Sequence, residues 1–183
     1  MSNRSILLTG APYHILAPLS SWLPASDTQQ TCIGTVIQFK TLPTLQFSDL
    51  QTKTFPWYFG LQTTLPLALA VTLPGRPFGP AGGIQGLFDS ANRWGTLLPL
   101  ATIFITGLVN WAVLLPVSKE CIVERRKQEE KDGKRSWDPQ PHSQEMAALN
   151  KKFGILHGIS SLLNVVNFVA SVVYGVTLAG RIH

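Results

Sequence analysis

The sequence predicts an all-α integral membrane protein, a single domain of 183 residues that folds as an antiparallel helical bundle. Apolar residues gather in long uncharged runs, and the charged residues, only 14% of the chain, are bunched between those runs. A helix needs roughly 20 mostly apolar residues to cross a bilayer, and three runs come close to that length or exceed it. Polar residues inside the runs recur at helical spacing. We therefore expect three spans plus a divergent first helix, four in total.

The first predicted helix covers residues 14–39 and departs from an ordinary membrane span. Asp27 would lie near mid-membrane, where an aspartate costs about 2.5–3.5 kcal/mol. Two glutamines and two prolines nearby make the segment less favourable still. Two interpretations stay open: the first helix is broken, or the segment reflects a divergent or mis-spliced gene. The apolar stretch 32–39, CIGTVIQF, is typical of the end of such a helix.

The second predicted span covers residues 55–73. A polar connection precedes it, and the QFSDLQ run in that connection predicts a short helix at the membrane surface. Trp57 and Tyr58 fit the aromatic belt of a membrane interface, and Pro66 should kink the span. The next loop contains GPAGGIQG, which lacks the GK[ST] ending of a phosphate-binding loop. We therefore expect no nucleotide site there.

The third and fourth predicted spans cover residues 94–117 and 153–178. The loop between them, 119–152, is dense in charges of both signs. Its first part should form a helix that ends at Gly133, and Ser143 should cap the helix that continues into the fourth span. Eleven of the fifteen Lys and Arg residues fall on the membrane side that holds this loop. The positive-inside rule then places the loop in the cytosol and both termini on the opposite side.

Each of the last two spans carries a polar stripe along one face. Because hydrocarbon offers no partner for an amide, both stripes should look into protein. Gly154 and Gly158 would let another backbone approach closely, and Asn167 should pair with Thr102. The candidate intramembrane polar cluster comprises Asn110, Thr106, His157, Ser161 and Asn164. Hydrogen bonding that holds the bundle together is the simpler interpretation, and a lined pathway or binding site is the alternative.

Three segments carry a family resemblance: LNKKFGILHGISSLLN, FKTLPTLQFSDLQTKTFPWYF and NRWGTLLPLATIFITGLVN. With them, the chain from about Thr31 to Arg181 resembles the transmembrane-protein-205-like family, particularly its fungal-type members. The resemblance implies a small four-helix membrane protein. That family has no established biochemical activity, so the resemblance implies no catalytic residues.

The sequence contains no recognisable catalytic, cofactor-binding or metal-binding motif, so no residue is assigned to those roles. Cys32 and Cys121 fit no disulfide framework or metal spacing, and reversible palmitoylation of Cys121 is an alternative to a free thiol. The net charge of +5 is modest, and its location favours anionic lipid over nucleic acid as a partner. Other membrane proteins are further possible partners.

The expected function is that of a polytopic, non-enzymatic protein of the endomembrane system or the plasma membrane. It would act in trafficking, in solute handling or as a scaffold within a complex. The alternative is a small four-helix membrane enzyme or a transporter subunit, with an intramembrane polar site around His157.

Overall fold

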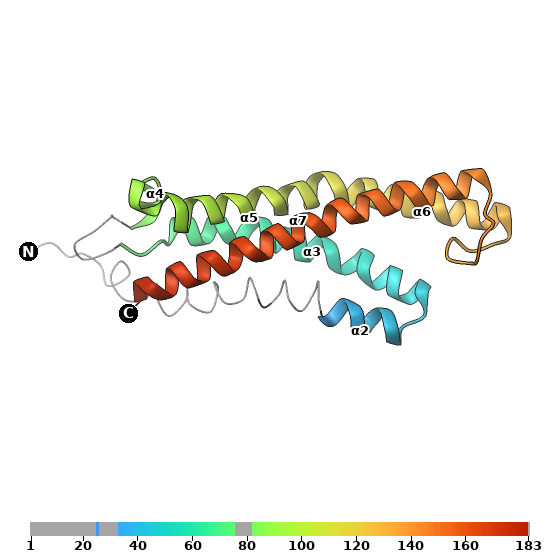
Figure 1. Ribbon diagram of the computed structural model, residues 1–183, viewed down its shortest axis with the longest axis horizontal. Coiled ribbons are helices and arrows are strands. Elements are labelled where there is room, and N and C mark those ends of the chain that lie inside the picture. The colour runs from blue at the N-terminus through green and yellow to red at the C-terminus, as the bar shows by residue number, and fades with distance from the viewer. Residues whose placement is uncertain (1–24, 26–32, 76–81, 183) are drawn as a thin grey trace, which may run out of the picture.

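The computed structural model describes residues 25, 33–75 and 82–182. Over these residues every regular element is helical, in agreement with the predicted fold class (Figure 1). The predicted helix 14–39 lies largely outside the described residues. Its last residues fall in a described helix, α2 (Gly34–Thr41).

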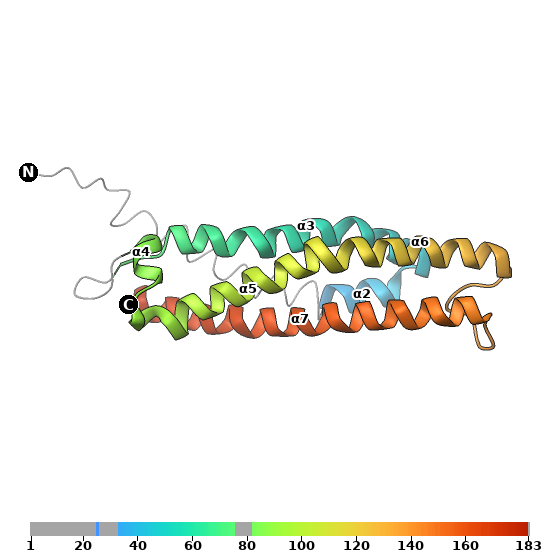
Figure 2. The same ribbon diagram turned by 90° about the horizontal axis from the view of Figure 1, so that it is seen from above.

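Three long helical rods run side by side along the length of the molecule (Figures 1 and 2). The first rod is α3 (Thr44–Val71) and the last is α7 (Gln144–Ile182). The middle rod packs against both of them. It is built in order from η3 (Ser90–Asn92), η4 (Arg93–Leu97), α5 (Leu98–Val109), η5 (Asn110–Leu114) and α6 (Leu115–Asp132). The short helix α4 (Gly83–Leu87) joins α3 to this rod.

Prolines widen two turns of the middle rod. Pro116 has no backbone N–H and cannot close an ordinary helical turn. The turn before it is a π turn, in which the N–H of Leu115 donates to the carbonyl of Asn110. A second π turn precedes Pro99 in the same way. The turn before Pro116 begins at Asn110, the residue whose side chain reaches α7.

The bundle has its apolar core at the end that holds α4. The buried side chains of this core come from α3, the residues directly after it, α4, α5 and α7: Leu69, Leu73, Leu87, Leu100, Ile103, Ala170, Tyr174 and Leu178. Ile103 is fully buried, whereas Ile105, two residues further along α5, is 56% exposed. One face of α5 therefore faces protein and the other faces the surroundings.

The helices α3 and α5 approach each other closely at Gly107. A Cβ atom there would lie 3.1 Å from the backbone and side chain of Gln62 and 3.1 Å from the nitrogen of Thr63. At Gly154 and Gly158 a Cβ would meet nothing within 4 Å among the described residues, so the predicted close approach there stays a prediction for the segment outside them. A second close contact lies at Gly95, where a Cβ would be 2.8 Å from the side chain of Thr177 on α7.

Two helices are long and apolar enough to cross a membrane, namely Ser90–Asp132 and Gln144–Gly180. Only 28% and 33% of their most apolar windows are buried inside the protein, so most of that apolar surface faces outward. The rod α3 does not reach this hydropathy, because Gln62 and neighbouring threonines dilute its apolar residues. It also begins at Thr44, so the predicted surface helix and the predicted second span form one continuous helix.

The segment 119–152 forms a helical hairpin, called the charged hairpin below. Its first helix ends at Gly133, which has a φ of 61° and the left-handed conformation that glycine tolerates. The second helix starts where Ser143 Oγ accepts the backbone N–H of Met146 at 3.1 Å. Both predicted helix boundaries are thereby confirmed.

Candidate functional site

A cavity of about 320 Å³ lies among α2, α3, α6 and α7, at the end of the bundle next to the charged hairpin. This volume falls within the range of small-molecule sites, roughly 300–1,000 Å³. The aromatic side chains in its wall are Phe39, Phe47, Phe55, Phe59, Trp137 and Phe153. Phe39 and Phe47 meet edge to face, with ring centroids 5.4 Å apart, and so join α2 to α3. The lining is predominantly apolar.

The cavity is elongated along the helices. Its lining residues on α7 run from Phe153 to Asn164, and those on the middle rod run from Glu129 back to Leu114. At 1.5 Å per residue, the α7 side alone spans about 16 Å. The cavity therefore has two distinct ends, one at the charged hairpin and one at Asn164.

The Asn164 end is polar. Asn164 is 7% exposed, and its Oδ1 accepts a 3.0 Å hydrogen bond from Nδ2 of Asn110. The amide nitrogen of Asn164 makes no hydrogen bond to any described residue, although the side chain lines the cavity. Asn110 is fully buried, and its Oδ1 has no partner within the described part of the chain. This pair joins α7 to the middle rod and leaves an amide donor at the floor of the cavity.

Thr106 belongs to a second polar contact, deeper in the bundle. Its Oγ1 accepts a 2.9 Å hydrogen bond from Nδ2 of Asn167, which also lies 3.3 Å from the carbonyl of Ile103. The predicted pairing of Asn167 with Thr102 is wrong, because the Thr102 hydroxyl donates to the carbonyl of Leu98 in its own helix. Asn167 is fully buried, as predicted for the polar stripe of α7.

His157 and Ser161 lie in the cavity wall and not beside Asn110. Within the candidate cluster, Asn110 forms a hydrogen bond to Asn164 alone. The His157 ring stacks on Phe153 with centroids 6.0 Å apart and an interplanar angle of 8°. Within the described residues it makes no hydrogen bond and no ion pair. The predicted cluster therefore divides into interhelical contacts and cavity-wall residues.

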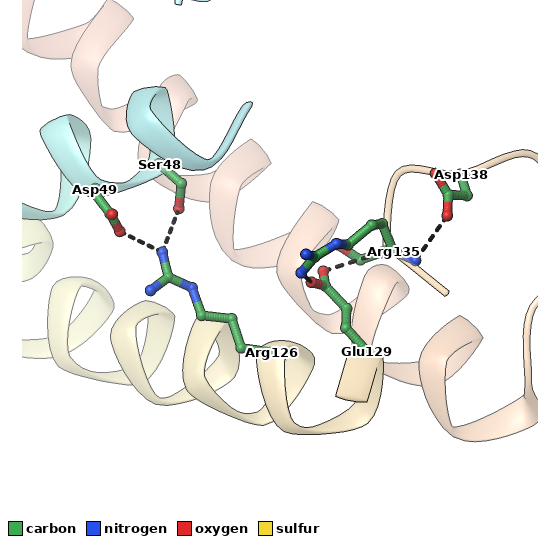
Figure 3. A network of polar contacts seen from close by, with 7 residues as sticks. Ser48, Asp49, Arg126, Glu129, Arg135 and Asp138 are labelled. Carbon is green, nitrogen blue, oxygen red and sulfur yellow. Dashed lines mark hydrogen bonds and ion pairs between the residues drawn. The ribbon is translucent and has the colours of Figure 1, made fainter. Parts of the chain in front are cut away.

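The other end of the cavity, called the mouth below, carries Arg125, Arg126 and Glu129. Figure 3 shows Arg126 reaching from α6 to Ser48 and Asp49 of α3, with which it forms a hydrogen bond and an ion pair.

Glu129 is buried and also has partners at the mouth. It accepts a 3.2 Å bond from the Arg135 side chain and a 3.0 Å bond from the Ser136 backbone N–H (Figure 3). Burial alone would raise the pKa of Glu129, but the hydrogen bonds from Ser136 and Arg135 outweigh it and hold that pKa below its usual range.

Arg125 is the exception among these charges, since it pairs with no carboxylate of the described residues. Its Nε donates to Oδ1 of Asn150 at 3.0 Å, and its guanidinium carbon lies 4.5 Å from the centroid of the Phe153 ring. The two terminal nitrogens make no hydrogen bond to the described residues. Burial lowers the pKa of the Arg125 guanidinium. A half-buried cation with free donors thus faces an apolar cavity.

Cys121, one turn before Arg125, is fully buried, and its thiol lies 3.7 Å from the carbonyl of Leu149. Burial raises the pKa of the thiol, which reduces the reactive thiolate form. An acyl donor has no access to this sulfur in the folded protein, so a free thiol fits the structure better than palmitoylation.

Sequence reasoning missed Arg125 and the phenylalanines of the cavity. Arg125 stands in a dense run of charges and reads there as part of a solvated helix face. The phenylalanines lie at separate places along the chain and meet only after folding. One signal was present: Phe55 and Phe59 are one helical turn apart, and Phe47 lies on the same continuous helix.

The described residues contain no group of three or more His, Cys, Asp or Glu arranged to hold a metal ion. Fold and cavity together define a class: a helical bundle with an aromatic cavity next to a charged hairpin. The chain belongs to the family that carries the domain of unknown function DUF4149, whose model matches residues 21–127. It is 30% identical to the xanthocillin biosynthesis cluster protein D of Aspergillus fumigatus over 171 residues, 93% of this chain and 90% of the relative. No solved structure matches the chain.

Proposed function

We propose that this chain is a polytopic membrane protein that binds a hydrophobic small molecule and handles it without chemical conversion. The observation that carries the proposal is the cavity of about 320 Å³ with six aromatic side chains in its wall. A cavity of ligand size favours solute handling over trafficking or scaffolding, since neither of those roles needs one.

The relative in Aspergillus fumigatus supports a biosynthetic setting. It is named as a protein of a biosynthesis cluster, and the match covers nearly the whole of both chains. We extend that setting to this chain as an accessory membrane protein of a biosynthetic pathway. Kinship with the transmembrane-protein-205-like family is part of the same proposal, and the three sequence segments quoted above support it.

The membrane arrangement is also part of the proposal. The apolar helices Ser90–Asp132 and Gln144–Gly180 contain the predicted spans 94–117 and 153–178, and α3 supplies a third span because it packs along α5. The predicted helix 14–39 completes four. The charged hairpin faces the cytosol of an endomembrane or the plasma membrane. Glycosylation acceptors placed in the hairpin should stay unmodified in microsomes, while acceptors in the loop 74–93 should be modified; the reverse pattern would overturn the orientation.

The cavity can be tested by filling it. Ser161 lines the cavity, and Val165, one turn later on α7, is 53% exposed. The full-length protein in phosphatidylcholine nanodiscs would be labelled with a diazirine-bearing methyl palmitate and mapped by mass spectrometry. Label should appear at the aromatic wall, Ser161→Phe should abolish it, and the control Val165→Phe should preserve it. Label confined to the lipid-facing surface of wild type would contradict the proposal.

A second candidate, a membrane enzyme or transporter subunit, is supported by His157 in the cavity wall. General-base chemistry would need a polar group to orient the imidazole, and the described residues supply only the stacked Phe153 ring. His157→Ala separates the two candidates. Under our proposal it leaves the labelling of the cavity intact, and under the alternative it abolishes activity or transport while the fold survives.

A further inference from the structure

We propose that the cavity selects an anionic amphiphile, a molecule with an apolar body and one acidic group, and that Arg125 binds the acid. This inference rests on the proposed binding function and adds the class of ligand. The two ends of the cavity differ in charge. The wall is apolar and aromatic along most of its length from Asn164, whereas the mouth carries two arginines and one glutamate.

Among the described residues, Arg125 is the cation at the mouth that forms no ion pair. Arg126 pairs with Asp49, and Glu129 pairs with Arg135. The nearby Glu124 pairs with Lys152 at 3.1 Å. Arg125 is left with a neutral amide, Asn150, and an aromatic face.

Two contacts orient the guanidinium of Arg125 and leave its terminal N–H groups available to an anion. The Nε bond to Asn150 and the stacking on Phe153 fix its plane without using the terminal nitrogens. An arginine carries five N–H donors, so four remain for a ligand. A carboxylate or phosphate accepts two of them side by side, which is the geometry that arginine matches best.

The depth of Arg125 fits an amphiphile that enters from the membrane surface. Arg125 lies eight residues, about 12 Å, beyond the predicted end of the third span at 117. Lys152 directly precedes the predicted fourth span and pairs with Glu124, the residue before Arg125. An acidic group at the headgroup level and an apolar chain in the cavity would each meet a matching environment.

The same chemistry has two sources, a free acid or the headgroup of an anionic phospholipid. The test uses the full-length protein in nanodiscs with two probes, diazirine-bearing palmitic acid and its methyl ester. Wild type should be labelled at the cavity at least about tenfold more efficiently by the acid than by the ester, a factor that corresponds to about 1.4 kcal/mol. Replacing phosphatidylcholine by phosphatidylserine should suppress the acid's labelling if the site takes phospholipid headgroups, and should leave it unchanged if it takes free acids; either result supports an anionic ligand.

The variants assign the selectivity to Arg125. Arg125→Gln should remove the preference for the acid. Arg125→Lys should retain part of it, because lysine keeps the positive charge but cannot donate two parallel hydrogen bonds to one carboxylate. Lys127→Gln is the matched control, since it removes the same charge from an exposed position of the same helix and should keep the preference. Thermal melting of each variant verifies folding.

Equal labelling by acid and ester, or a preference that survives Arg125→Gln, would overturn the inference and leave the cavity proposal standing. If neither probe labels the cavity of wild type, the proposed binding function fails as well. The two failures are therefore distinguishable.

Discussion

The same three helical rods form both ends of the bundle, but the space between the rods is filled differently at each end. At the α4 end, Leu69, Ile103 and Tyr174 are at most 1% exposed and fill the space between α3, α5 and α7. At the hairpin end, α3, α6 and α7 enclose the aromatic cavity instead.

Tightly packed apolar side chains are concentrated at the α4 end, away from the cavity. Gly107 brings α3 and α5 together at mid-bundle, and Asn167 joins α7 to α5. Beyond these contacts phenylalanine rings line the cavity, and polar contacts join α6 to α3 and to α7 near the hairpin. The α4 end thus serves as scaffold, and the hairpin end is free to hold a ligand.

The largest effect should come from emptying the scaffold end. Ile103→Ala removes a fully buried side chain and should lower the free energy of unfolding by about 2–5 kcal/mol. Ile105→Ala, at a position 56% exposed, should change it by less than about 1 kcal/mol. SDS titration in mixed micelles measures both. Equal losses would show that the buried and the exposed face of α5 do not differ in packing.

The helix contact at Gly107 should give the next largest effect. A Cβ there would press on the backbone of α3 at 3.1 Å, so Gly107→Ala should cost about 1–3 kcal/mol. The control is Gly154→Ala, which meets nothing within 4 Å and should be neutral or stabilising by up to about 1 kcal/mol. A destabilised Gly154→Ala protein with an unaffected Gly107→Ala protein would reverse the assignment of the close contact.

The amide pair at the cavity floor should contribute less. A double-mutant cycle of Asn110→Ala and Asn164→Ala should give a coupling free energy of about 0.6 kcal/mol, the average for hydrogen bonds between membrane helices. The same titration measures it. Strict additivity of the two substitutions would mean that the 3.0 Å contact between the amides contributes nothing to stability.

The smallest effect should be local and pH-dependent, at the mouth. The pKa of Glu129 is held below its usual value, so its stabilisation is complete above about pH 4.3 and is lost as the pH falls through the lower folded value. Below that value the Ser136 amide should lose its protection, and its exchange should approach the intrinsic rate for that pH. Hydrogen exchange measures this, and Glu129→Gln should lose the pH dependence. Protection of Ser136 that does not change with pH would contradict the role of the carboxylate.

The elements that the sequence predicted well are those set by local patterns. Apolar runs located α5 and α7, and Gly133 and Ser143 marked the helix boundaries of the hairpin. The polar stripe of α7 was predicted to face protein, and Asn164 and Asn167 do so. Each of these signals depends on residues within a few turns of one another.

What the sequence could not predict depends on contacts between distant segments. The cavity needs α2, α3, α6 and α7 together, and the helical spacing of Phe55 and Phe59 alone does not show which other helices face them. The role of Arg125 depends on which acids are already taken, and Asp49, the partner of Arg126, lies 77 residues away. The sequence could not distinguish Gly107, which lies close to α3, from Gly154 and Gly158, because it does not show which helices face each other.

The most direct test of the account is an experimental structure of the full-length protein extracted with its native lipids. The account predicts elongated density in the cavity that Phe59 and Asn164 line. The polar end of this density should lie at the terminal nitrogens of Arg125. A cavity closed by its own side chains, with Arg125 paired to a carboxylate of the protein, would contradict it.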